Sequence, residues 1–143
     1  MYFPVVEALD MLAVAFESDF DYRIVSREEM PDKYGETIPG MNLIRIREDV
    51  CSRATLGSGR DRYTIAHEIG HWLLHDLKSI SLARSTFANT PKYCQPEWQA
   101  NEFASHLLMP RELIRNKEVQ TIMTECGVSN EAASIQMAKF RIK

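Results

Sequence analysis

The sequence predicts a small α+β domain in which amphipathic helices pack around a short sheet. Apolar residues recur with a helical period in three long segments, over 61–77, 96–109 and 129–143. One short segment, 41–47, alternates apolar and polar residues as a strand with two different faces does. The 143 residues have the length of one domain, and no linker or repeat divides them, so we expect a single domain over 1–143.

Composition and charge exclude several classes of protein. The hydrophobic fraction of 45% and the charged fraction of 26% are typical of a folded, soluble chain rather than a disordered one. A net charge of −3 provides no basic excess for nucleic-acid binding. No apolar run is free enough of charge to span a membrane, and the first residues lack the features of a signal peptide. Three separated cysteines without a CxxC pair favour a reducing compartment, so we expect a cytoplasmic protein.

The first half of the chain is expected to hold one helix and two strands. Pro4 suits a first helical turn, and the apolar residues that follow it at helical spacing form a stripe that faces the core. The segments 21–25 and 41–47 are predicted strands, and the glycine-bounded segment 35–40 is a predicted turn.

The second half is predicted to be mainly helical. The predicted elements, in order, are a loop over 56–60, a helix capped by Asp61 that runs to about Leu77, an irregular connection over 78–95, a helix from Pro96 that ends before Pro110, and a helix over 111–126. Gly127 is expected to end that helix, and Ser129 to cap the last one.

An HExxH motif, formed by His67, Glu68 and His71, lies within the first of these long helices. Four residues advance a helix by about 400° and about 6 Å, so the two imidazoles point the same way, one turn apart. Two imidazoles in that arrangement can bind one tetrahedral zinc ion. Glu68 lies about 100° round the helix, beside the metal, where it can hold a water molecule and take its proton. The motif therefore predicts a zinc site with Glu68 as general base.

A third ligand has to come from another part of the chain. A straight helix would place His75 about 12 Å from His67, so we expect His75 to support the site rather than bind the same ion. In the helix that begins at Pro96, Glu97 lies within or at the edge of the apolar face, where a carboxylate needs a cationic partner. Glu97 is therefore the predicted third ligand. Glu102, on the polar face, is predicted to be a solvated charge.

Two neighbours of Glu97 have possible roles at the same site. Asn101 follows Glu97 by one turn and could hydrogen-bond to a ligand histidine, although an ordinary bond to the backbone is the alternative. Cys94 closely precedes Glu97 and could bind zinc and keep an enzyme latent, but we expect a buried, inert thiol there.

Two sequence blocks carry a resemblance to a known family. They are residues 67–75, HEIGHWLLH, and residues 97–110, whose EWQANEFA and LLMP segments match most closely. In this order and with this separation they resemble the ImmA/IrrE family of zinc metallopeptidases, most specifically over 61–110. The resemblance implies a small zincin-like, gluzincin-type domain. Its three-stranded sheet, antiparallel or mixed, would pack on the zinc helix, and a helical pair over 110–143 would resemble a helix-turn-helix.

The resemblance also implies an activity and a set of site residues. The implied ligands of one zinc ion per chain are His67, His71 and Glu97, with Glu68 as the catalytic base. The implied activity is endopeptidase cleavage of a partner protein. That partner would be a helix-turn-helix repressor, and its cleavage would release mobile-element, phage or stress genes.

Two features of substrate handling stay open at this point. The oxyanion that forms during peptide hydrolysis needs a hydrogen-bond donor, and both His75 and Tyr93 are candidates. The strand over 41–47 could offer an edge to which an extended substrate adds, or it could be an ordinary strand of the sheet.

Two other functions compete with proteolysis. The chain could bind zinc without cleaving its partner and act as a sensor or antagonist. It could instead bind DNA, because residues 124–140 resemble a helix-turn-helix core. Against this, residues 111–143 carry only two more basic than acidic side chains, which is a weak basis for contacting phosphates.

Overall fold

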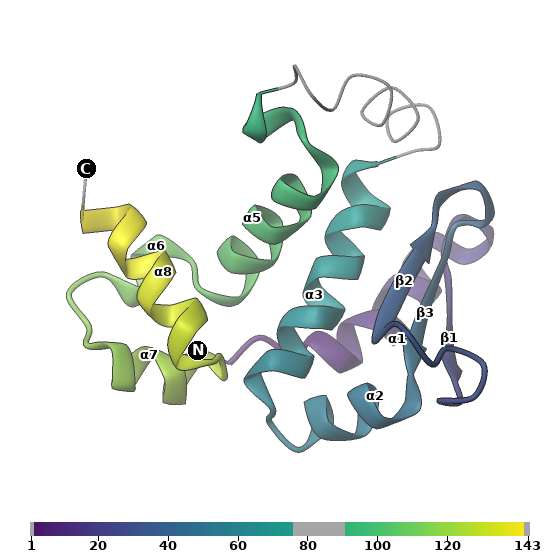
Figure 1. Ribbon diagram of the computed structural model, residues 1–143, viewed down its shortest axis with the longest axis horizontal. Helices are drawn as coiled ribbons and strands as arrows, with labels where there is room; N and C mark the ends of the chain where they lie inside the picture. The colour runs from purple at the N-terminus through teal and green to yellow at the C-terminus, as the bar shows by residue number, and fades with distance from the viewer. Residues whose placement is uncertain (1, 76–90, 142–143) are drawn as a thin grey trace.

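The computed structural model describes residues 2–75 and 91–141 and confirms the α+β class (Figure 1). The helices, in chain order, are α1 (Val5–Phe16), α2 (Glu48–Thr55), α3 (Gly59–Leu74), α5 (Pro96–Leu108), α6 (Arg111–Ile114), α7 (Val119–Cys126) and α8 (Asn130–Arg141). The central helix α3 contacts the sheet, α1 and α2 on one side and α5 on the other. The last three helices form a lobe beyond α5. No described helix has the length and hydropathy of a membrane span.

The sheet has the three strands that were expected and is mixed, one of the two arrangements left open. Its strands are β1 (Asp21–Val25), β2 (Gly35–Ile38) and β3 (Leu43–Arg47), in the spatial order β1-β3-β2. Strand β3 pairs in parallel with β1 and antiparallel with β2. The possibility that the strand over 41–47 offers an edge is therefore wrong, because both sides of β3 are paired. The edge that lies beside α3 belongs to β2.

Two sequence predictions in this region need correction. The predicted turn over 35–40 contains β2, whose four half-buried residues are too few to show an alternating pattern. The predicted strand over 41–47 is shorter at its start, because Met41 ends a 3-10 turn and Asn42 has a left-handed backbone with φ of 49°. Helix α2 was not predicted. It is short and buries only Val50 and Ala54, so its sequence is mostly polar.

Helix α3 begins earlier and ends earlier than its sequence predicts. The side chain of Ser58, not Asp61, caps its start and accepts a hydrogen bond from the backbone N–H of Asp61 at 3.4 Å. Its last residue is Leu74 instead of Leu77, since the backbone at His75 is extended, with φ of −128° and ψ of 132°. Helix α3 therefore contributes both histidines of the HExxH motif, while His75 follows its end.

The C-terminal helices agree with the prediction except in one place. The predicted helix over 111–126 is interrupted between α6 and α7, where Asn116 has a positive φ of 64°. Gly127 ends α7 in a left-handed conformation, and Ser129 accepts the N–H of Ala132 at 3.1 Å at the start of α8. The predicted irregular connection over 78–95 lies mostly outside the described residues. Its described end includes a single 3-10 turn, Lys92–Cys94.

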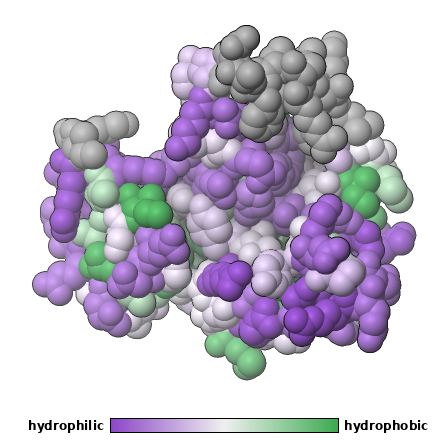
Figure 2. Space-filling model, viewed as in Figure 1, coloured by the Kyte–Doolittle hydropathy of each residue, from purple (hydrophilic) through white to green (hydrophobic). Residues whose placement is uncertain are grey.

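Close packing brings α3 and α5 together. A Cβ atom on Gly70 of α3 would lie 2.9 Å from a ring carbon of Phe103 on α5, so the glycine permits the approach of the two helices. The buried side chain of Arg62 joins α3 to the N-terminal segment and to the turn between α7 and α8, because it donates hydrogen bonds to the carbonyls of Phe3 at 2.7 Å and Gly127 at 2.9 Å. The face in Figure 2 is mostly hydrophilic, with small hydrophobic groups over the C-terminal lobe and beside the sheet.

Candidate metal centre

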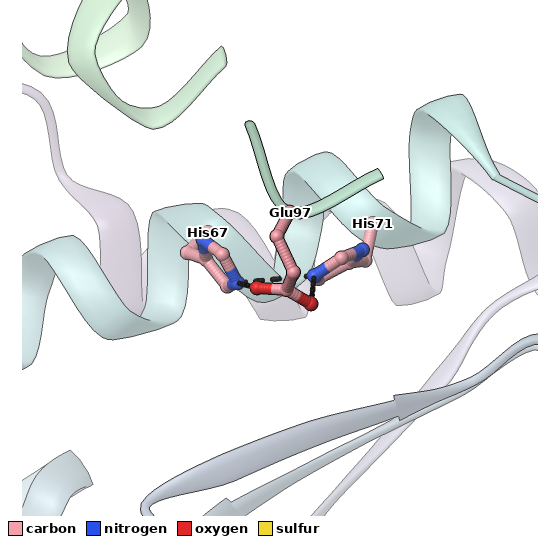
Figure 3. A group of neighbouring side chains, drawn as sticks. All are labelled: His67, His71 and Glu97. Atoms are coloured by element: carbon pink, nitrogen blue, oxygen red, sulfur yellow. Dashed lines mark hydrogen bonds and ion pairs between the residues drawn. The ribbon is translucent and has the colours of Figure 1, made fainter. Parts of the chain in front are cut away.

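His67 and His71 extend from one side of α3 toward Glu97 in the first turn of α5 (Figure 3). The Nε2 atoms of the two histidines are 3.0 Å apart. The Glu97 carboxylate contacts both of them, with one oxygen 3.2 Å from His67 Nε2 and the other 3.0 Å from His71 Nε2. One potential ligand atom from each residue lies within 4.8 Å of the others. The structure thus brings together the three residues that the sequence predicts as ligands.

The dimensions and chemistry of this cluster fit a zinc ion. Ligand distances of about 2.0–2.1 Å in a tetrahedron place the ligand atoms about 3.3–3.4 Å apart, slightly more than the separations observed here. Two imidazole nitrogens and one carboxylate oxygen form a donor set that zinc accepts, and three protein ligands leave a fourth position open. Small outward rotations of the side chains would therefore accommodate the ion.

Contacts within the cluster shift the pKa values of its members. Hydrogen bonds from His67 and His71 hold the pKa of the Glu97 carboxyl well below its usual range, so this group is ionised. Burial opposes protonation of His67, but contact with Glu97 and the nearby charge of Glu68 outweigh it and raise the pKa of His67. A proton on His67 therefore compensates the charge of Glu97 in the absence of a metal, and a bound divalent cation would replace that proton.

Both histidines of the cluster have a partner on the nitrogen that faces away from it. His67 Nδ1 lies 2.8 Å from the side-chain oxygen of Asn101, which lies on α5 one turn after Glu97. His71 Nδ1 lies 3.0 Å from Nδ1 of the buried His75. Burial lowers the pKa of His75, which favours its neutral form. Such contacts orient metal-binding imidazoles, so Asn101 and His75 are both placed to support the site.

Glu68 lies next to this cluster but faces the sheet. It is buried, and the hydroxyl of Thr37 on β2 donates a hydrogen bond to its carboxylate at 2.7 Å. The same hydroxyl lies 2.9 Å from the backbone oxygen of Glu68. Burial raises the pKa of Glu68, and the bond from Thr37 only partly opposes that shift. A carboxylate with a raised pKa is a better proton acceptor near neutral pH than an ordinary one.

The two glutamates of α5 do not have the environments that the sequence predicts. The Glu97 side chain is 68% exposed because it lies in the first turn, where the helix end leaves one side open. The Glu102 side chain is only 20% exposed and forms an ion pair with Lys139 of α8. The prediction of a solvated Glu102 is therefore wrong, because the C-terminal lobe covers that side of α5.

Cys94 and Tyr93 lie in the short turn just before α5. Cys94 is exposed, so the expectation of a buried thiol is wrong. Its position in a single 3-10 turn, outside the packed helices, explains the difference. Tyr93 in the same turn is 63% exposed, and its backbone oxygen accepts a hydrogen bond from the Gln99 side chain at 3.0 Å.

Sequence reasoning missed Thr37 and Gln99. Thr37 was part of a predicted turn, and no local pattern pairs it with Glu68, thirty-one residues away. No role was expected for Gln99, whose side-chain oxygen lies 2.8 Å from His75 Nε2. The spacing gave no signal for Gln99, because a residue two positions from both Glu97 and Asn101 lies on the opposite side of a regular helix.

Comparison with known proteins agrees with this geometry. No curated protein matches the chain significantly. The family model of the IrrE N-terminal-like domain, a family of M78 peptidases, matches residues 24–137, a range that includes the metal cluster, Glu68 and all of their described partners. The chain therefore belongs to the IrrE N-terminal-like domain family of M78 peptidases.

Proposed function

We propose that this chain is a zinc-dependent endopeptidase with His67, His71 and Glu97 as ligands of one ion and Glu68 as general base. One observation carries the proposal: the buried carboxylate of Glu68 lies on the same helix as the two histidines of a cluster that could hold a metal, and it has its own hydrogen-bond donor. Membership of a peptidase family supports the same conclusion.

The chemistry divides between the metal and the chain. When bound, zinc would polarise the scissile carbonyl and make a water molecule more acidic. Glu68 takes the proton of the attacking water and passes it to the leaving amine. Thr37 holds the carboxylate of Glu68 from the sheet side. Tyr93 is the remaining candidate for the donor that stabilises the oxyanion, because both ring nitrogens of the buried His75 are occupied by His71 and Gln99.

The outer edge of β2 is the proposed binding site for an extended substrate segment. Within the described residues, β2 pairs only with β3, so its other edge is open. Thr37 lies on β2 and contacts Glu68, so a segment that adds to this edge would run beside the base. This assignment replaces the central strand β3, whose two edges are occupied.

The partner and its compartment are proposed from family membership and composition. The proposed substrate is a helix-turn-helix repressor, whose cleavage would derepress mobile-element, phage or stress genes. The three cysteines are free, which is compatible with the reducing cytoplasm that we propose. Direct DNA binding by the last helix is disfavoured, because Lys139, its first basic residue, is paired with Glu102.

Substitution of Glu68 by Gln tests the proposed activity. Gln is nearly isosteric and cannot accept a proton, so the variant should keep its zinc and lose at least about 10²–10⁴-fold in cleavage rate. The measurement is co-expression with candidate helix-turn-helix repressors, with the products identified by mass spectrometry and the zinc occupancy matched.

The outcomes of this experiment distinguish the possible roles of Glu68 and separate a peptidase from a non-catalytic sensor. Equal cleavage by both proteins would remove Glu68 from the mechanism, and loss of zinc from the variant would make Glu68 a ligand. If neither protein cleaves the true partner, the chain is instead a zinc-binding sensor or antagonist.

A further inference from the structure

A chain of three hydrogen bonds leads from the metal cluster to the segment before α5. His71 Nδ1 lies 3.0 Å from His75 Nδ1, and His75 Nε2 lies 2.8 Å from the Gln99 side-chain oxygen. The Gln99 side-chain nitrogen then donates to the backbone oxygen of Tyr93 at 3.0 Å. The proposed mechanism uses Tyr93 only as a candidate oxyanion donor and has no role for Gln99.

The direction of every bond in this chain follows from its last acceptor. A backbone carbonyl can only accept, so the Gln99 amide must direct its nitrogen to Tyr93 and its oxygen to His75. An amide oxygen also only accepts, so His75 carries its hydrogen on Nε2. A neutral imidazole has one N–H, which leaves His75 Nδ1 as the acceptor for a hydrogen on His71 Nδ1.

These bond directions fix the tautomer of His71, one of the proposed metal ligands. With its other hydrogen on Nδ1, His71 can release the hydrogen that Nε2 shares with the Glu97 carboxylate at 3.0 Å and offer the lone pair of Nε2 to a metal in its place. This is the tautomer that a metal requires at that nitrogen. His67 reaches the same state by a single bond, from its Nδ1 to the Asn101 side-chain oxygen at 2.8 Å.

We propose that Gln99 is a positioning residue for the metal centre, which acts through His75 to hold His71 in its metal-binding tautomer and orientation. This role rests on the zinc site of the proposed function but not on proteolysis. It also makes the turn that carries Tyr93 part of the same hydrogen-bonded unit as the metal ligand.

Zinc affinity tests this role without a substrate. Gln99→Leu removes the acceptor of His75 at similar size, and loss of such a partner should weaken zinc binding about 10–100-fold in competition with a chromophoric chelator. Gln99→Glu restores an oxygen acceptor for His75, so its affinity should stay within a few-fold of wild type. Gln120→Leu, on an exposed position of α7, is the matched control and should leave the affinity unchanged.

The tautomer is read independently from ¹⁵N-labelled histidine by NMR of the zinc-loaded protein. His75 should carry its hydrogen on Nε2 in the wild type and lose that preference in Gln99→Leu, with helix content by circular dichroism showing that the variant is folded. Wild-type affinity in a folded Gln99→Leu, or a hydrogen on His75 Nδ1 in the wild type, would overturn the proposal.

The results also separate this role from the proposed function. A wild-type chain that binds no zinc would overturn both. Zinc binding without cleavage of the partner would overturn only the peptidase activity.

Discussion

The residues of the HExxH motif contact different elements on two sides of α3. On the α5 side, the ligand histidines contact side chains of another helix, including Glu97 and Asn101. On the sheet side, Glu68 contacts Thr37 of the edge strand β2. One helix thus presents the proposed metal ligands to one neighbour and the proposed base to another. Metal affinity and base positioning should therefore respond to different substitutions.

Removal of the third ligand should have the largest effect and act only on the metal side. Glu97→Ala should lower zinc affinity by more than about 100-fold, since even loss of a ligand's partner costs about 10–100-fold. Because the Glu97 side chain is 68% exposed, the fold should change little. Glu102→Ala is the matched control on the same helix, and it should keep the zinc while losing the ion pair with Lys139. Metal analysis after gel filtration measures both variants. A Glu102→Ala variant that loses zinc while Glu97→Ala keeps it would reverse the assignment of the two glutamates.

Loss of the hydroxyl on the sheet side should act only on the base. Thr37→Val preserves the shape of the side chain and removes a hydrogen bond to a charged group, which contributes about 1.5–3 kcal/mol. We expect kcat for the cognate substrate to fall about 10-fold or more, with zinc affinity unchanged. Thr37→Ser retains the hydroxyl and should recover most of the rate. If Thr37→Val lowers zinc affinity as much as kcat, the two sides of α3 are not independent.

Replacing a glycine by alanine on either side of α3 should have smaller effects on stability and zinc binding, and these effects should differ between the two sides. Gly70→Ala places a Cβ 2.9 Å from the Phe103 ring, so α3 and α5 must move apart. Overpacking of about 1–3 kcal/mol, offset by the better helix propensity of Ala, should leave a net loss of about 1 kcal/mol in the free energy of unfolding and weaker zinc binding. Gly35→Ala places a Cβ 3.2 Å from Glu68 Cγ, so it should disturb cleavage and spare the metal. Urea unfolding and chelator competition on both variants make the comparison, and equal loss of zinc would contradict it.

Much of the fold followed from local patterns. Period and capping signals located α1, α3, α5 and α8, because a helix satisfies its backbone within a continuous segment and shows its buried face at regular spacing. The short elements β2 and α2 were missed, since four to eight residues with few buried side chains have no readable period. The interruption at Asn116 was missed for a related reason, because apolar residues continue on both sides of it.

Residue type and helical spacing are enough to place His67, Glu68 and His71 together on one helix. What each of them contacts depends on the tertiary structure. It showed that β3 is paired on both sides and that Glu102, rather than Glu97, is the covered glutamate of α5. It also placed Thr37 and Gln99 at the site. The physical reason is separation along the sequence. Helical geometry relates residues up to about four positions apart. These contacts instead join distant segments, whose approach depends on how whole elements pack.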